Sequence, residues 1–424
     1  MNHRNSLIRS FIGIGFIRSL AILAGLVTSI LLARTLSPET FGQYAFAMAF
    51  LPILTLPVAG GLPSLLTREI AGYVHNQEWS LYKGLVNSAH FFVFILSLVV
   101  FICFGLIVRI IPPEEKWTLV GIIVVLMPIQ GLNSIRNGII KGLGYPAYAE
   151  VPMQVIHPIL VLTSCVILAY LYNLTSVTAI WTQVLAGSIS LLFASYAYRY
   201  FRPKELKIFQ PHYRIKEWAI ALSPLTLIVL VNTFNTRIGI IMLGILGTDE
   251  AVAALRVGES SARFVGLPIV LVNAVISPHI VRLTKIGNTR SLQQLSRKSA
   301  RGALIIALPF ALILGFFGKP LILHIFGQEY VEVAYLPLLF LTFSQLFSVF
   351  CGSVGQLLSM SGNEKETLKG QIFSLGLNIL TCFLLIPIYG APGAAIGTSV
   401  GIISWNILLG ISVHKKLKIR PSIF

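Results

Sequence analysis

Charged residues are scarce in this sequence, and acidic residues are the scarcer kind. Of its 424 residues 11% are charged and 55% are hydrophobic, and 15 acidic residues stand against 32 Lys and Arg. Soluble domains carry about 25% charged residues, so this composition excludes an ordinary soluble globular protein. A net charge of +17 would suggest nucleic acid as a partner in a soluble protein, but in a membrane protein the distribution of charge must be considered first.

Cysteine and histidine are too few and too scattered for a metal site or a disulfide framework. No CxxC pair occurs, and all four cysteines lie in apolar runs: Cys103, Cys165, Cys351 and Cys382. We interpret them as small buried hydrophobic residues. His90 and His157 stand alone in apolar runs with no second ligand at a suitable spacing. We therefore expect neither a metal nor a cofactor.

Enzyme motifs are missing as well. The sequence contains neither a GxxxxGK[ST] nor an HExxH motif. A membrane glycosyltransferase or polymerase would need acidic catalytic residues in a sizeable outer loop, and every predicted outer loop is short. We expect a protein that is not an enzyme, and the glycosyltransferase or polymerase remains the less favoured alternative.

Apolar runs of 18 or more residues recur along the whole chain. Each is long enough to cross a hydrocarbon core about 30 Å thick, whereas a barrel would show alternating segments of about ten residues. The sequence predicts an all-α integral membrane protein with twelve transmembrane helices. The first run has a basic start and no cleavage site, so we expect a span and not a removed signal. The predicted spans are 10–33, 42–67, 84–110, 117–140, 149–171, 177–200, 217–246, 251–281, 295–318, 331–359, 366–388 and 392–414.

Basic residues gather in the connections on one side of these spans. They fall at the N-terminus, at 202–216, at 282–298 and at 415–420, whereas the opposite connections, such as Asp249-Glu250, are poor in positive charge. The positive-inside rule then predicts that both termini are cytoplasmic. The basic surplus is thus mostly topological, and no nucleic acid partner is expected. Arg136 and Lys141, which close the fourth span, are interpreted as interfacial side chains.

The two halves of the chain repeat one another weakly. Glu39 and Glu250, each in the turn of a hairpin, are 211 residues apart, and Gly144 and Gly362 are 218 apart. Six spans per half make the repeats parallel, which places a substrate site between two bundles near the membrane midplane. We predict an N-terminal six-helix bundle at 1–205 and a C-terminal one at 206–424. In the last span Gly393, Gly397 and Gly401 recur at four-residue spacing, which favours close helix packing.

The segment Arg237–Arg263 carries the strongest functional signal, because charged residues interrupt apolar runs there. Arg256, Glu259, Ser260 and Arg263 follow i, i+3, i+4, i+7 spacing and share one helix face. An arginine near the bilayer centre costs roughly 2.5–3.5 kcal/mol, so it normally faces a wet cavity or a partner. Three arginines against one glutamate leave a positive surplus. The pattern predicts a water-filled cavity that holds an anion.

Arg18, halfway along the first span, is the fourth candidate to bind the anion. An internal ion-pair network with Glu259 is the alternative, but one carboxylate cannot neutralise four arginines. Arg237 is the weakest candidate, because it lies about 140° around its helix from Asn232. Glu259 either pairs with Arg256 and Arg263 or binds a coupling proton or cation, and the sequence leaves both open.

Two stretches resemble a known family. Leu31–Glu39 (LLARTLSPE) with Phe41–Tyr44 (FGQY), and later Leu65–Ala71 (LLTREIA), resemble the opening signature of the bacterial polysaccharide biosynthesis, or O-antigen repeat-unit flippase, family. That family belongs to the multidrug/oligosaccharidyl-lipid/polysaccharide exporter superfamily. The resemblance implies two six-helix bundles around a V-shaped cavity with alternating access. It also implies that an undecaprenyl-diphosphate-linked oligosaccharide moves from the cytoplasmic to the outer leaflet of the inner membrane.

The resemblance bears on partners and on rival functions. Its implied partners are the lipid bilayer, a polysaccharide polymerase and a chain-length regulator. Related flippases of the peptidoglycan lipid precursor use cavity arginines, including one on the first helix, where this chain has Arg18. They usually have two further C-terminal spans, so twelve spans favour another substrate. A cation-coupled multidrug exporter of the same superfamily is the alternative, and it would need acids in the cavity, where only Glu259 qualifies.

Overall fold

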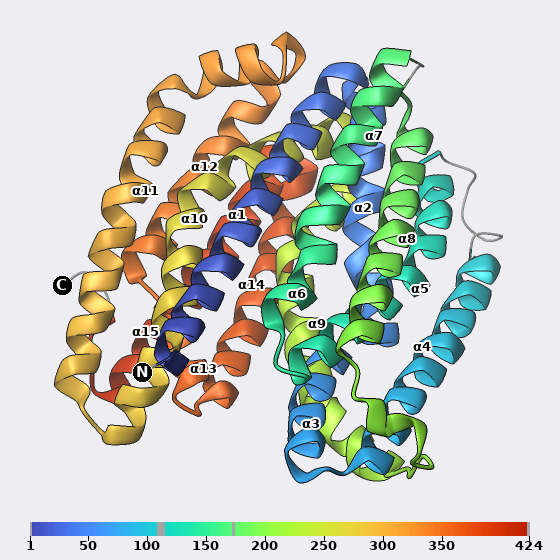
Figure 1. The fold of residues 1–424 in the computed structure, drawn as a ribbon. Coiled ribbons are helices and arrows are strands. Elements are labelled where there is room, and N and C mark those ends of the chain that lie inside the picture. Colours follow the sequence, from blue (N-terminus) through green and yellow to red (C-terminus); the bar gives the residue numbers. More distant parts are fainter. Residues whose placement is uncertain (1, 108–114, 172–173, 422–424) are drawn as a thin grey trace. The chain divides into compact units, whose positions relative to one another are not determined.

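The structure, a computed structural model, describes residues 2–107, 115–171 and 174–421, and every regular element in this part is helical (Figure 1). The side chains of residues 1–14, 16 and 274 lie outside the description, and with them the basic N-terminal segment. The first elements are α1 (Asn2–Thr35), α2 (Pro38–Ala59), α3 (Leu62–Asn76), α4 (Trp79–Ile107), α5 (Glu115–Gly142), α6 (Pro146–Val151), the π-helix η1 (Pro152–Ile156), α7 (His157–Leu171) and α8 (Ser176–Phe201). The later elements are η2 (Lys204–Lys207), α9 (Ile215–Leu246), α10 (Asp249–Ile286), α11 (Thr289–Ile325), η3 (Gln328–Tyr330), α12 (Val331–Cys351), α13 (Val354–Met360), α14 (Glu364–Tyr389) and α15 (Ala391–Leu417).

The lengths and apolarity of the helices confirm the predicted fold class. In the described part 11 helices are long and apolar enough to cross a membrane, and the number rises to 12 if the bent α10 counts as one span. The two parts of α10 meet at 45°, between Asn273 and Val275. The expected end of the third span, near residue 110, lies outside the described residues.

Two of the predicted spans are each interrupted by a break and do not form one continuous helix. The predicted span 42–67 is divided into α2 and α3 at Gly60 and Gly61, and Gly61 has a φ of 77° that favours glycine. The hydroxyl of Thr226 donates to the carbonyl of Gly60 at 2.8 Å, and this bond satisfies an acceptor that the break leaves free. The predicted tenth span is likewise divided at Gly352, whose φ is also 77°. Local turn chemistry therefore overrides the apolar pattern at both places.

Contacts divide the chain into two compact units. The C-terminal unit comprises residues 1–15, 29–46 and 234–424, and the N-terminal unit comprises residues 16–28 and 47–233. Both α1 and α9 contribute to both units. These units are defined by the contacts between residues, whereas the bundles predicted at 1–205 and 206–424 are defined by the repeat in the sequence. The bundle boundary near residue 205 stays a prediction.

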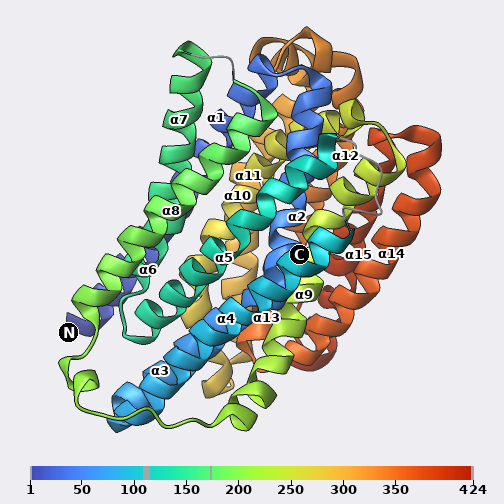
Figure 2. The ribbon, with the colours of Figure 1, turned by 90° about the vertical axis from the view of Figure 1, so that its right-hand side faces the viewer.

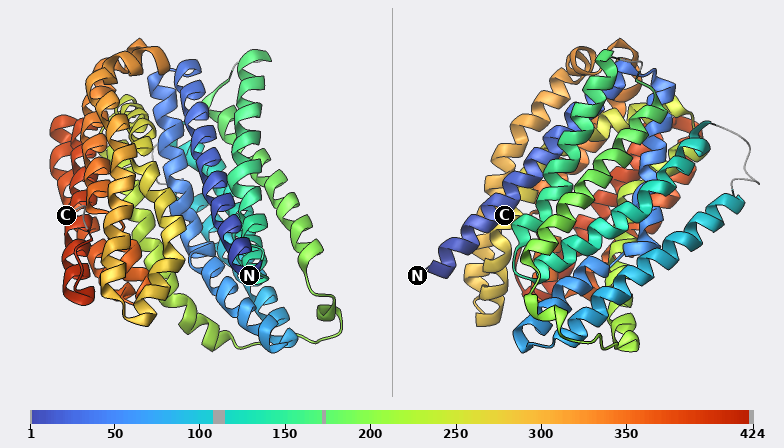
Figure 3. Two further views of the ribbon diagram at one scale, coloured as in Figure 1. Left: turned by 60° about the vertical axis from the view of Figure 1, so that its left-hand side comes forward. Right: turned by 45° about the vertical axis from the view of Figure 1, so that its right-hand side comes forward.

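In the N-terminal unit α7, α8, α5 and α4 are successive neighbours, and α3 packs on α5 (Figure 2). Its apolar core includes Leu66, Ile70, Leu85 and Ile139, all at most 2% exposed. The core extends to the start of α9, where the indole N–H of Trp218 donates to the hydroxyl of Tyr73 at 2.9 Å. Leu206, in the segment that joins α8 to α9, also packs against this core. Figure 3 shows this segment, residues 202–214, as it runs from α8 to α9.

In the C-terminal unit α10, α11 and α12 pack on one another, and α14 and α15 form a tight hairpin. The glycines of α15 make this hairpin tight. A Cβ at Gly397 would clash with the sulfur of Cys382, and one at Gly401 would lie 3.1 Å from the Cβ of Asn378. The close helix packing expected from the four-residue glycine spacing is confirmed.

The segment Leu31–Tyr44, which carries the family resemblance, docks the α1–α2 hairpin within the C-terminal unit. The guanidinium of Arg34 donates to the last carbonyls of α11, at 2.7 Å to that of Ile325 and also to that of His324. The ring of Phe41 meets that of Tyr330 edge to face, with centroids 6.3 Å apart. These contacts satisfy a helix C-terminus and bury aromatic surface, so this part of the resemblance has a structural basis.

Candidate functional site

One face of α10 carries the charged residues expected to bind an anion. Around this face the helix is packed against its neighbours, and Leu255 and Val257 are fully buried. Arg256 and Glu259 are partly buried, whereas Arg263 is exposed. The helix thus buries its apolar residues and leaves its charged face accessible, as the spacing predicted.

Three arginines and one glutamate interact electrostatically at this face. Nη1 of Arg256 lies 3.7 Å from Oε2 of Glu259, a loose ion pair one turn apart on the helix. Arg237, on α9, interacts with both of them, and Arg263 interacts with all three. The structure therefore brings Arg237, the weakest candidate, close to the others. One carboxylate among three guanidinium groups leaves a surplus of two positive charges.

Ser260 belongs to the same sequence pattern but has a different place. Its hydroxyl donates to the carbonyl of Arg256 at 2.8 Å and lies 3.2 Å from the hydroxyl of Ser29 on α1. It is 6% exposed, so it packs α10 on α1 and does not widen the charged face. On α9 the amide of Asn235 donates to the carbonyl of Gln371 at 3.0 Å, which ties that helix to α14.

Arg18 lies in the N-terminal unit and has its own acidic neighbour. Its Nη2 is 3.7 Å from Oε1 of Glu150, and the same oxygen is 2.7 Å from Nζ of Lys141. The side chain of Arg18 is 47% exposed, whereas that of Glu150 is 8% exposed. Arg18 and the arginines of α9 and α10 belong to different compact units, so a cavity common to all four stays a prediction.

Glu150 is the charged residue that the sequence analysis missed. It stands at the start of the predicted fifth span, whereas the sequence singled out Glu259 alone as an acid that could lie in the cavity. The turn after α5 includes Gly144, with a φ of 91°, and Pro146 opens α6. This turn returns the chain so that Glu150 faces Lys141. The sequence does show Lys141 and Glu150 as opposite charges on either side of a turn that contains glycine. Whether they pair depends on how the turn folds α6 back against α5.

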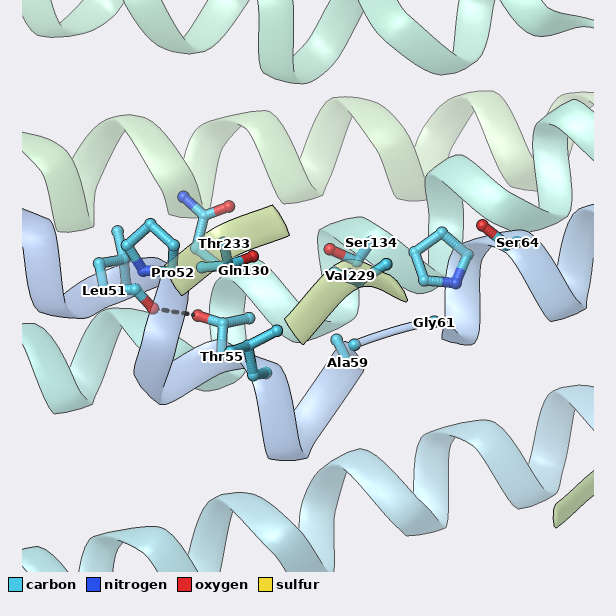
Figure 4. A pocket seen from close by; sticks show the side chains of 13 residues that line it. Leu51, Pro52, Thr55, Ala59, Gly61, Ser64, Gln130, Ser134, Val229 and Thr233 are labelled. Atoms are coloured by element: carbon cyan, nitrogen blue, oxygen red, sulfur yellow. Dashed lines mark hydrogen bonds between the residues drawn. The ribbon is translucent and has the colours of Figure 1, made fainter. Parts of the chain in front are cut away.

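A second feature of the N-terminal unit is a cavity of about 500 Å³ beside the break between α2 and α3 (Figure 4). Its polar lining comes from four helices, with Thr55 on α2, Ser64 on α3, Gln130 and Ser134 on α5, and Thr233 on α9. None of the described residues that line it is charged. Hydroxyl and amide groups around a neutral cavity suit a neutral polar ligand.

The histidines and acids of the described residues form no cluster of three that could hold a metal ion. His90 was interpreted as structural, and its Nδ1 lies 2.6 Å from the carbonyl of Val86 one turn earlier.

In fold the chain is similar to several solved transporters. An inward-facing multidrug resistance MATE family transporter of the MOP superfamily shares 17% identity and a TM-score of 0.79, over 95% of this chain and 98% of that one. Lipid II flippase MurJ, in an inward closed conformation, shares 16% sequence identity and a TM-score of 0.73, over 94% of this chain and 86% of that one. A MOP superfamily transporter from Pyrococcus furiosus shares 16% sequence identity and a TM-score of 0.68, over 97% of this chain and 95% of that one. At such identities the similarity establishes the fold alone.

Sequence comparison identifies the family. The model of the MatE family matches residues 224–384, and the model described as polysaccharide biosynthesis protein matches residues 7–284. Direct comparison with curated proteins finds no match. Because the second model spans well over half of the sequence, and the fold is that of MOP superfamily transporters, the chain belongs to the polysaccharide biosynthesis protein family.

Proposed function

We propose that this protein is a flippase for undecaprenyl-diphosphate-linked oligosaccharide repeat units. It moves them from the cytoplasmic to the outer leaflet of a bacterial inner membrane, with both of its termini in the cytoplasm. The observation that carries the proposal is the surplus of positive charge made by Arg237, Arg256 and Arg263. Arg237 lies in the candidate span α9, and the two others lie in α10, which is a candidate span if its two parts are taken together. Family membership supports the same conclusion.

The chemistry of the substrate fits this charge. A diphosphate carries negative charge that an apolar bilayer does not solvate, and arginine binds phosphate with two parallel hydrogen bonds. An arginine inside a membrane raises the free energy of insertion, so such arginines normally contact water or an anionic partner. Arg263, exposed on the charged face of α10, has guanidinium donors available for this purpose. Glu259 offsets part of the repulsion between its neighbours.

Arg18 is a further cation, and it belongs to the N-terminal unit. Its carboxylate neighbour Glu150 is shared with Lys141, whose contact is shorter by 1 Å. Arg18 is therefore the less tightly held of the two cations and keeps half of its surface accessible. A phosphate oxygen can replace the carboxylate as its partner while Lys141 continues to neutralise Glu150.

The neutral polar cavity of the N-terminal unit suits the sugar part of the substrate. Sugars present hydroxyl groups and apolar ring faces, and the lining offers both the amide of Gln130 and apolar surface from Leu51 and Pro52. In the proposed cycle the head group enters the protein, the lipid tail stays in the bilayer, and access alternates between the two leaflets. Substrate drives the change only insofar as it binds one access state more tightly than the other.

Reconstitution tests the proposal. Purified protein in vesicles is given a fluorescent undecaprenyl diphosphate carrying an oligosaccharide, and a membrane-impermeant quencher reports how much label reaches the other leaflet. We expect transfer with the protein and none in protein-free vesicles. Undecaprenyl alcohol with the same label, which lacks the diphosphate, is the matched control and should not be moved faster than in empty vesicles. Equal rates for both lipids would contradict the proposal.

A cation-coupled multidrug exporter is the second candidate, and two observations favour it. The MatE model matches residues 224–384, and Glu150 and Glu259 are acids of low exposure inside helices that are long enough to span a membrane. Such acids are candidates for proton or cation binding. Efflux of ethidium from vesicles under an imposed proton or sodium gradient, without movement of the labelled lipid, would establish this function instead.

A further inference from the structure

A second cavity of the N-terminal unit lies between α4, the end of α8 and the segment that follows it. Its volume is about 270 Å³, and we call it the linker pocket. Tyr82, Lys83 and Asn87 of α4 form one side, Tyr198 of α8 another, and Arg202 and Lys207 the third. It shares no residue with the charged face of α10, with the Arg18–Glu150 pair or with the cavity in Figure 4.

Three cations line the linker pocket and no acid accompanies them among the described residues of its lining. Nζ of Lys83 donates to the carbonyl of Phe209 at 3.0 Å, which orients its ammonium group without neutralising it. Arg202 and Lys207 are exposed and form no ion pair within the described part of the chain. Three like charges around one small space repel one another unless an anion joins them.

Behind Tyr198 lies a fourth cation with an unused donor. The guanidinium carbon of Arg136 is 4.8 Å from the centre of the Tyr198 ring, and its Nε donates to the hydroxyl of Ser195 at 3.3 Å. Its Nη1 is buried and has no hydrogen-bond partner in the described structure. Tyr82 interacts electrostatically with both Arg136 and Arg202. Arg136 is not part of the pocket's described lining, but its charge adds to the positive potential of the site.

The wall of the linker pocket is fixed by backbone contacts. The backbone N–H of His212 donates to the carbonyl of Ser80 at 2.9 Å. A Cβ at Gly84 would clash with the carbonyl oxygen of His212, so glycine allows the segment to lie directly on α4. Together with the Lys83–Phe209 bond, these contacts hold the segment after α8 against the helix (Figure 3). The cations are thus presented by a preorganised site, which reduces the entropic cost of binding.

We propose that the linker pocket binds a phosphate group, and that its source is the headgroup of an anionic membrane lipid. Basic pockets between transmembrane helices are known to hold phosphate headgroups, and Arg and Lys are the side chains that bind them. The size admits a phosphate with a few attached atoms but not an oligosaccharide. Exposed apolar side chains close to the lining in sequence, Tyr200 and Ile208, favour a lipid over a soluble phosphate. The proposal does not depend on the proposed transport function.

The test compares two double variants with the same change of charge. Arg202→Gln/Lys207→Gln removes two pocket cations, and Lys415→Gln/Lys416→Gln removes two exposed cations at the end of α15. All are full-length chains, placed in nanodiscs of phosphatidylcholine with or without phosphatidylglycerol. Lipids that copurify are counted by native mass spectrometry, and thermal unfolding is followed in parallel.

We expect wild type and the α15 variant to retain phosphatidylglycerol and to melt at higher temperature when it is present. The pocket variant should bind it at least about ten-fold more weakly, since each basic residue contributes about a five-fold factor. Inorganic phosphate added to phosphatidylcholine nanodiscs is the second arm. If it alone stabilises wild type, and the pocket variant loses the effect, the pocket binds phosphate from solution. Equal retention and equal melting of both double variants with either ligand would overturn the proposal.

Discussion

Nζ of Lys141 lies 2.7 Å from Oε1 of Glu150, across the turn that joins α5 to α6. The carboxylate of Glu150 is nearly buried and water hardly reaches it, so Lys141 is its principal partner. We expect Glu150→Gln to lower the free energy of unfolding by about 1–3 kcal/mol, because it leaves a partly buried ammonium group without its counter-charge. Thermal and denaturant unfolding in detergent measure the loss.

A double-mutant cycle separates the pair from general damage. Lys141→Gln/Glu150→Gln should lose less stability than the two single changes added together, by about 0.5–3 kcal/mol. The pair of Lys369 with Glu366, at 3.1 Å but with Lys369 73% exposed, is the control, and Lys369→Gln should cost less than about 1 kcal/mol. Strict additivity at Lys141 and Glu150 would show that they do not interact in the folded protein.

Alanine at Arg18, Arg256 or Arg263 should impair export while the protein stays in the membrane. Each change removes a cation that the proposed diphosphate needs, and lysine should be milder wherever charge matters more than the planar guanidinium. Surface polysaccharide on gels, compared with membrane abundance on blots, measures the effect. Arg290→Ala, at an exposed position of α11, is the control and should leave export unchanged. Full polymer from all three alanine variants would eliminate the cavity assignment.

Glu259 distinguishes a structural partner from a coupling site. We favour pairing, because Arg256 lies 3.7 Å from Glu259 and Arg263 interacts with it electrostatically. On that basis Glu259→Gln alters stability or substrate affinity, and transport keeps its dependence on the proton or sodium gradient. Reconstituted vesicles with an imposed gradient and a lipid-linked sugar measure this. A gradient-driven wild type whose Gln variant transports equally with and without the gradient would identify Glu259 as the coupling residue.

Gly42→Ala should destabilise the C-terminal unit. A Cβ at this position would clash with the carbonyl oxygen of Asp249, a backbone atom that cannot swing away. The loss should reach or exceed the 1–3 kcal/mol that is typical of overpacking, seen as low membrane abundance and early melting. Gly25→Ala is the matched control, since it is also inside a helix and a Cβ there meets nothing within 4 Å. Similar behaviour of both variants would mean that the hairpin turns do not touch.

How much the sequence predicted depends on whether a property is local. Membrane spans follow from apolar length, and the described residues contain 11 candidate spans, or 12 if α10 counts as one. Helical spacing put Arg256 and Glu259 one turn apart, where they form an ion pair, and binding of an anion at this face stays a prediction. The breaks at Gly60–Gly61 and at Gly352 were not predicted, because the apolar runs continue across them. Glycine permits such breaks, but a partner such as Thr226 decides that they occur.

The sequence by itself determined a helical membrane protein with a cationic patch, because hydrophobic length and helical period are properties of consecutive residues. Only the tertiary structure decided which charges meet. In the folded chain Arg237 interacts with the charged residues of α10, and the hydroxyl of Ser260 lies close to that of Ser29. Glu150 forms ion pairs with Lys141 and Arg18. These relationships join residues on different helices, and their distances depend on how turns and packing place whole helices, which no local pattern encodes.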